Sequence, residues 1–177
     1  MVRPFTTHGF RAYLDFPFNS TERAYVTNGM AGNLSVRAEA ARNAGGFDEN
    51  FVGMAYRFET EFCRRLARLG KILFEPAASV RHLRAPSGGI RRYGDPRTSA
   101  SPAVSVGDYY FALRQGLSLA GLGYAAARPF REVVTRFHLK RPWWIPVKLI
   151  GEGGALLWAL GLAWKGPRLL GPAATGS

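Results

Sequence analysis

The clearest pattern of apolar and polar positions lies between Glu59 and Leu69. Apolar residues recur there three or four positions apart, at Phe62, Cys63, Leu66 and Leu69, and arginines fall between them. This is the period of a helix that buries one face. The sequence therefore predicts an amphipathic helix that Gly70 ends. Glu59 and Glu61 fall in its first turn, where the positive end of the helix dipole favours acidic side chains.

Weaker patterns predict further elements on both sides of this helix. Good helix formers from Arg37 to Asn43 precede a glycine pair, Gly45 and Gly46, which is typical of a helix end. Short apolar runs predict strands, and two later stretches predict helices. The expected strands are 33–36, 71–74 and 78–83, and the expected later helices are 107–116 and 128–139.

Beyond Arg141 the composition changes to PWWIPVKLIGEGGALLWALGLAWKGPRLL. The longest uncharged apolar run, Gly153 to Trp164, has 12 residues, whereas about 20 are needed to span a bilayer. Paired tryptophans and flanking lysines are typical of a helix that lies in the plane of a membrane surface. A terminal helix packed on the protein core is the alternative.

The composition indicates how many domains the chain can form and what net charge it carries. A chain of 177 residues, 47% of them hydrophobic, can bury the core of one domain. We expect that domain at 1–140 and a membrane-associating tail at 141–177. The net charge of +12 predicts phosphate-bearing partners. Cys63 is the only cysteine, which excludes an intrachain disulfide and fits a cytoplasmic protein at the inner face of the membrane.

The residues with candidate chemistry follow the amphipathic helix. Glu59 and Glu61 begin that helix, and His82 stands before an arginine- and glycine-rich loop, RAPSGGIRRYGDPRTSASP. Sugar transfer from a nucleotide donor needs a base for the acceptor hydroxyl and a cation for the departing diphosphate. This set supplies both types of group. The spacing fits equally a pair of dipole-stabilising glutamates and a structural histidine.

The arginines of the same loop, with Tyr93 among them, also fit contact with nucleic acid. The sequence has no helix-turn-helix, zinc or RNA-binding signature. We therefore expect no nucleic-acid partner, and a loop that meets the phosphates of a sugar nucleotide or of a lipid surface.

The longer run from Gly32 to Gly89 resembles the acceptor-side half of inverting family 2 glycosyltransferases. In that family a Gly-x-Asn-type segment leads to a helix and GGFDE, and then to an acidic motif that begins a helix ending in Arg-Leu. Here Gly32 and Asn33, the GGFDE of 45–49, and Phe-Glu-Thr-Glu at 58–61 follow in that order. The resemblance implies an α/β fold: part of a GT-A-type, Rossmann-like sandwich with mixed strands and a carboxy-terminal amphipathic helix.

The resemblance also implies roles for the residues. Glu59 would be the general base, and Glu61 would orient the acceptor or the base. His82 would help to hold a divalent metal, Mn²⁺ or Mg²⁺, on the donor diphosphate. Gly32 and Asn33 would bind substrate, together with loop residues that close over the donor: Arg84, Ser87, Gly88, Gly89, Arg91 and Arg92.

Two features depart from the family pattern. Phe58 replaces the usual first acid, and the family's donor-binding half, with its Asp-x-Asp motif, has no counterpart in this sequence. The expected partners are a nucleotide-sugar donor, a glycan or lipid-linked acceptor, a separate amino-terminal half and a membrane surface. The alternative is a catalytically silent remnant that acts only in membrane or protein association.

Overall fold

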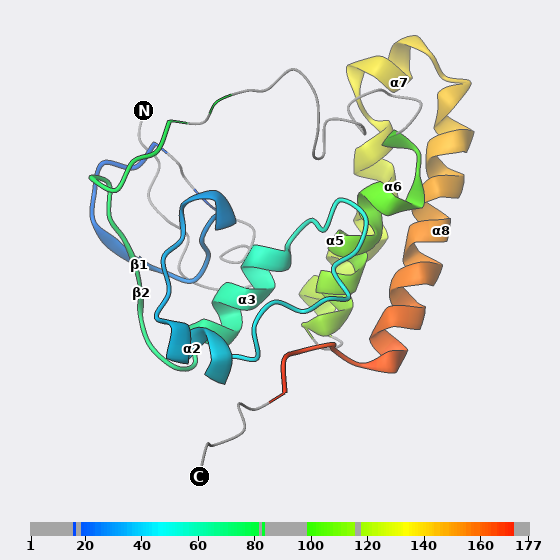
Figure 1. Cartoon of the computed structure of the whole chain (residues 1–177). Coiled ribbons are helices and arrows are strands. Elements are labelled where there is room, and N and C mark those ends of the chain that lie inside the picture. The colour runs from blue at the N-terminus through cyan, green and yellow to red at the C-terminus, as the bar shows by residue number, and fades with distance from the viewer. Residues whose placement is uncertain (1–15, 17–18, 82, 84–98, 116–117, 172–177) are drawn as a thin grey trace. The chain divides into compact units, whose positions relative to one another are not determined.

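The computed structural model describes residues 16, 19–81, 83, 99–115 and 118–171 (Figure 1). Over these residues the fold is mixed α/β and largely helical, with six α-helices and one small sheet of two strands. The chain divides into two compact units. The first contains the described residues of Met1–Asp48, Phe58–Leu83 and Arg168–Ser177, and the second those of Glu49–Arg57 and Arg84–Pro167.

The first unit combines a two-stranded sheet with two short helices. Strand β1 (Ala24–Val26) pairs antiparallel with β2 (Ile72–Phe74). A 3-10 turn, η1 (Ala31–Asn33), and helix α2 (Ala38–Asn43) precede helix α3 (Phe58–Leu66). The apolar face of α3 closes a small core against α2 and the chain before it, formed by Ala44, Phe62 and Leu66 with Leu34, Val36, Ala40, Ala41 and Ile72.

A glycine pair ends α2 as the sequence predicts. Gly45 and Gly46 have φ angles of 80° and 66°, which side chains disfavour. Their N–H groups donate to the carbonyls of Arg42 and Ala41 at 2.8 and 2.9 Å, the Schellman arrangement. The chain that follows the last helix returns to this turn, where the N–H of Leu170 donates to the carbonyl of Gly45.

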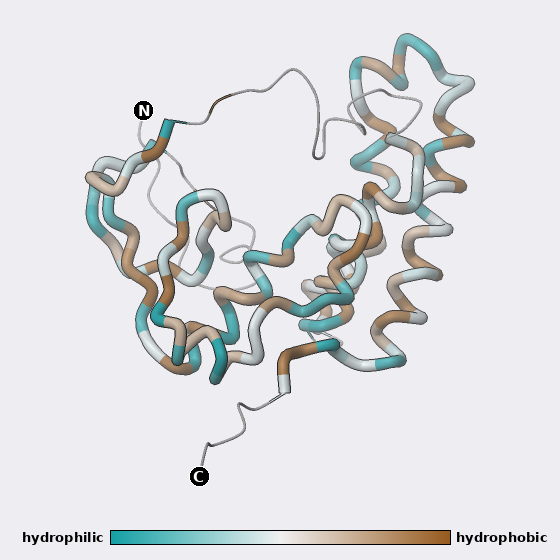
Figure 2. The backbone as a smooth tube through the Cα atoms, viewed as in Figure 1, coloured by the Kyte–Doolittle hydropathy of each residue, from teal (hydrophilic) through white to brown (hydrophobic). Residues whose placement is uncertain are grey.

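The second unit is helical. Its members are α5 (Pro102–Arg114), α6 (Leu119–Val133), α7 (Arg136–Lys140) and α8 (Trp144–Lys165). Helix α5 packs against both α6 and α8, which also contact each other. From Ser105 to Ala112 every residue of α5 is buried. Apolar residues recur along α8 from end to end (Figure 2).

Several predicted elements differ in the structure. Residues 34–36 form no strand, and the described residues of 78–83 form none either. The predicted helix at 128–139 is interrupted, because the Thr135 hydroxyl accepts from the N–H of His138 and begins α7. The mixed-strand sandwich is reduced, among the described residues, to the antiparallel pair β1–β2.

The carboxy-terminal helix is longer than the uncharged run suggested. Helix α8 has 22 residues and is long and apolar enough to cross a membrane, judged by length and composition alone. Glu152, which ended the uncharged run, lies inside the helix and is buried, as is Lys148 one turn before it. Charged residues interrupt a linear apolar run, but not a helical apolar face.

Candidate functional site

Helix α3 carries the predicted catalytic glutamates at its amino-terminal end. Glu59 is half-buried and Glu61 is buried. The GGFDE turn lies beside this end, because the Phe47 ring packs on the rings of Phe58 and Phe62 at centroid distances of 5.3 and 4.4 Å. Two of the three motifs behind the family resemblance therefore meet around Glu59.

Glu61 is held by an ion pair inside the unit. The Arg65 guanidinium, one helical turn later, donates to both carboxylate oxygens at 2.7–3.0 Å. The same guanidinium donates to the Ala44 carbonyl at the end of α2. The pair thus ties α3 to α2 and satisfies a helix-end carbonyl. Residues two apart in a helix point to different sides.

Cys63 lies one turn after Glu59 and is fully buried. Burial raises the pKa of its thiol to about 11; a hydrogen bond with the Gly29 backbone lowers this pKa by less, and the Glu59 carboxylate raises it by a still smaller amount. A thiol with so high a pKa stays protonated at neutral pH and is a poor nucleophile. Cys63 is therefore a packing residue between α3 and the segment before η1.

The other predicted site residues divide into two groups. Gly32 and Asn33 lie exposed in η1, and the Asn33 amide donates to the Ala78 carbonyl at 2.6 Å. This bond fixes η1 beside the chain that leads toward His82. The remaining predicted residues lie outside the described part of the chain: His82, Arg84, Ser87, Gly88, Gly89, Arg91 and Arg92.

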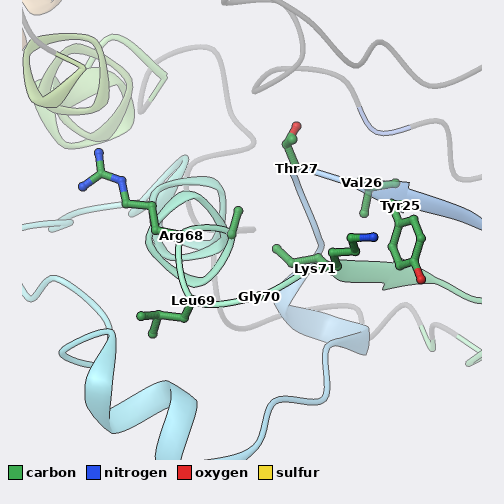
Figure 3. Close-up of a pocket in the computed structure, with 9 residues that line it drawn as sticks. Tyr25, Val26, Thr27, Arg68, Leu69, Gly70 and Lys71 are labelled. Carbon is green, nitrogen blue, oxygen red and sulfur yellow. The ribbon is translucent and has the colours of Figure 1, made fainter.

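An open hollow of about 430 Å³ lies at the opposite, carboxy-terminal end of α3 (Figure 3). The end of β1, the turn after α3 and the start of β2 line it. Lys71 lies over the Tyr25 ring at 4.7 Å, and Arg68 lines the rim. Arg68 and Lys71 come just after the carboxy-terminal end of α3. The helix dipole gives that end a partial negative charge, which favours basic side chains there. The predicted site and this hollow are thus at different ends of one helix.

A divalent metal needs several oxygen or nitrogen ligands around one point. Among the residues that the structure describes, no three His, Cys, Asp or Glu side chains are grouped in this way. Glu61 is occupied by Arg65. The described residues thus do not form a metal site.

Sequence reasoning missed a buried ionic network in the helical unit. Glu152 of α8 is 1% exposed and accepts from the Ser105 and Tyr109 hydroxyls of α5 at 2.5 and 2.8 Å. Lys148 lies 2.9 Å and Arg128 3.4 Å from its carboxylate. These bonds lower the pKa of Glu152 although burial alone would raise it. The sequence signals were the four-residue spacings of Lys148 with Glu152 and of Arg128 with Glu132.

The network continues at a second carboxylate, Asp108 of α5. Asp108 accepts from Arg57 at 3.2 Å and from the Tyr124 hydroxyl at 2.9 Å, and it pairs with Arg128 at 3.2 Å. Glu132 pairs with Arg128 and Lys148. Three cations, Arg57, Arg128 and Lys148, thus balance three anions, Asp108, Glu132 and Glu152. A buried charge is tolerated when it is paired in this way.

Comparison with known proteins gives no relative of this chain: no family model, no curated protein and no solved structure matches it. The functional argument therefore rests on the motifs and on the geometry around α3.

Proposed function

We propose that this chain is the acceptor-side part of an inverting, GT-A-type family 2 glycosyltransferase, with Glu59 as its general base. The observation that carries the proposal is the arrangement at the start of α3. The GGFDE turn packs against this end through Phe47, while Arg65 engages Glu61 on the other side. Glu59, the other acid of the motif, is half-buried.

In the proposed reaction the Glu59 carboxylate takes the proton of an acceptor hydroxyl. The acceptor oxygen then forms a bond to the anomeric carbon of the donor sugar as the bond to the nucleotide diphosphate breaks. Attack from the face opposite the leaving group inverts the anomeric configuration. A positioned base of this kind contributes about 10²–10⁴-fold to the rate. Glu61 is a positioning residue, which keeps α3 in place through Arg65.

The donor would be a nucleotide-diphosphate sugar and the acceptor a glycan or lipid-linked sugar. His82 and the loop residues 84–92 are the residues of this chain proposed to reach that diphosphate. A separate amino-terminal half would supply the remaining contacts with the nucleotide and the metal.

The test is sugar transfer by the purified chain with Mn²⁺ and a panel of nucleotide sugars, alone and with a separately encoded amino-terminal half. We expect turnover only with the second half, and at least a 100-fold loss for Glu59→Gln. Glu59→Gln should leave the unfolding midpoint nearly unchanged. Glu61→Gln is the matched control, because it leaves Arg65 without its carboxylate and should lower stability by about 2 kcal/mol or more.

Either of two results would contradict this assignment. Transfer by the chain alone would remove the need for a second half. No donor binding under either condition would favour the alternative function, a catalytically silent remnant that acts in association with a membrane or another protein. The observation that favours this alternative is the outward apolar face of α8.

A further inference from the structure

Helix α8 has two faces of opposite character, and the polar one is buried. Lys148, Gly151, Glu152, Ala155 and Ala159 form the buried stripe. The opposite side presents four large apolar residues, each seven positions from the next: Trp143, Ile150, Leu157 and Trp164, which are 67%, 75%, 72% and 93% exposed. Seven residues are close to two helical turns, so these four lie on one line along the helix.

Helix α6 repeats this arrangement. Its charged residues Arg128 and Glu132 belong to the internal network, and Gly121 and Arg128 are its buried residues. The other side of α6 and the residue just after it present Leu119, Phe130 and Val134, which are 89%, 69% and 70% exposed. Both helices therefore keep paired charges inside and apolar side chains outside, the reverse of a helix on a water-exposed surface.

The exposed charges of the helical segment 99–167 have a single sign, whereas Glu49 is an exposed acid elsewhere in this unit. Among the described residues from 99 to 167, the exposed charged side chains are all basic: Arg131, Arg136, Lys140, Arg141 and Lys165. Three of them lie in or directly after α7, at one end of α8, and Lys165 lies at the other end. Tryptophans also stand at both ends, and tryptophan and basic residues are favoured at the boundary between lipid chains and headgroups.

We propose that the outward faces of α6 and α8 together bind an anionic lipid bilayer. The apolar side chains enter the hydrocarbon boundary and the five basic residues contact acidic headgroups. A second copy of the chain fits this face less well, because a symmetric contact would bring the same basic residues together.

The proposed contact with lipid involves only the outward side of α8. The buried stripe of α8 faces α5, and α5 is itself covered by the segment 49–57, where Gly107 approaches the Tyr56 backbone and the Met54 N–H donates to the Ala103 carbonyl. Lipid on all sides of α8 would expose Lys148 and Glu152, which is costly. The unit therefore lies on one leaflet, and the surface includes α6 as well as α8. This inference is independent of the proposed sugar transfer.

Intrinsic fluorescence tests the proposal directly, because the four tryptophans of the chain, 143, 144, 158 and 164, all lie in α8 or at its first turn. The purified full chain is titrated with vesicles of neutral phosphatidylcholine or of phosphatidylcholine mixed with phosphatidylglycerol. We expect a blue shift, stronger binding to the anionic vesicles, and quenching by lipids brominated near the headgroup more than by lipids brominated near the chain end.

Two variants distinguish the contribution of α8 to vesicle binding from that of α6. Leu157→Glu on α8 and Phe130→Glu on α6 should each weaken vesicle binding about tenfold or more, because each places a charge at the hydrocarbon boundary. Leu69→Glu, the same type of change at an exposed apolar residue of the first unit, is the matched control and should bind like the wild type. Circular dichroism checks that all three variants keep their helices.

Three results would overturn the proposal. No response to either vesicle would exclude lipid binding. A blue shift that grows with protein concentration and is insensitive to brominated lipid would assign the face to a second copy of the chain. Wild-type binding by Phe130→Glu would remove α6 from the surface.

Discussion

At the scale of single residues, the environment of a side chain decides its chemistry more than its type does. Glu59 and Glu61 stand two positions apart in one helix, yet Glu61 is buried and paired with Arg65 while Glu59 stays partly accessible. The i,i+4 spacing of Glu61 and Arg65 was readable in the sequence. The bond from Arg65 to the Ala44 carbonyl was not, because it joins residues that only the packing of α2 on α3 brings together.

Cys63 allows a prediction on pH. Its pKa is about 11 in the folded chain, and about 9 in an unfolded one. Between these values the unfolded chain releases a proton that the native chain keeps. The stabilising contribution is therefore complete below about pH 9 and is lost as the pH rises toward 11. At about pH 10 the loss should be about 1 kcal/mol.

Urea unfolding at about pH 8 and at about pH 10 measures this loss. Cys63→Ala is the comparison, because it removes the thiol and leaves every other titrating group in place. The stability of the variant should fall less over this pH interval than that of the wild type. Equal falls in the two proteins would show that the thiol ionises equally in the folded and unfolded chain.

At the scale of elements, the sequence predicted best those helices and strands that are defined by residues close to them in the chain. The glycine pair after α2, the apolar spacing of α3 and the apolar run at β2 all act within a few residues of the element they define. Strand β1 has three residues and exists through its pairing with β2, about fifty positions later. No local pattern encodes such a pairing. The predicted strand at 33–36 and the described residues of the one predicted at 78–83 form no strand for the same reason, since a short apolar run becomes a strand only beside a partner.

Close packing at the buried stripe of α8 predicts different effects for two glycines of one helix. A Cβ on Gly151 would lie 1.8 Å from the Ala100 carbonyl oxygen, whereas a Cβ on Gly161 meets nothing within 4 Å. Gly151→Ala should therefore lower the free energy of unfolding by about 3 kcal/mol or more, because backbone has to move. Gly161→Ala should raise it by up to about 1 kcal/mol through helix propensity.

Thermal unfolding followed by tryptophan fluorescence reports on α8 and measures both variants. Because the two changes are identical and the two sites share a helix, only the contact of Gly151 distinguishes them. A Gly151→Ala variant as stable as Gly161→Ala would show that Ala100 does not approach α8 this closely in solution.

At the scale of the whole molecule, the distribution of charge is the main feature that could not be predicted from the order of residues alone. The net charge of +12 suggested contact with phosphates but not where the charges lie. In the helical unit the acidic side chains Asp108, Glu132 and Glu152 are drawn into the network, and this leaves basic residues exposed. A surface that combines apolar and basic side chains follows from a charge-neutral interior.

Neutrality of that interior is testable through Lys148 and Glu152. Glu152→Met alone leaves Lys148 and Arg128 with one carboxylate fewer, which should cost about 3–5 kcal/mol. The double variant Lys148→Met with Glu152→Met removes one charge of each sign, so Arg57 and Arg128 still balance Asp108 and Glu132. Its loss should be less than half that of the single variant, the remainder reflecting the Ser105 and Tyr109 hydroxyls that no longer have Glu152 as an acceptor.

Urea unfolding of the full chain, followed by tryptophan fluorescence, compares the two variants. A double variant as unstable as Glu152→Met would mean that the individual hydrogen bonds, and not the balance of charge, hold the unit together. If the double variant recovers, its vesicle binding should match that of the wild type, because both substituted residues lie on the buried stripe of α8. Recovery of stability with loss of binding would instead place Lys148 or Glu152 at the lipid contact, and the charged side of α8 would then face the membrane.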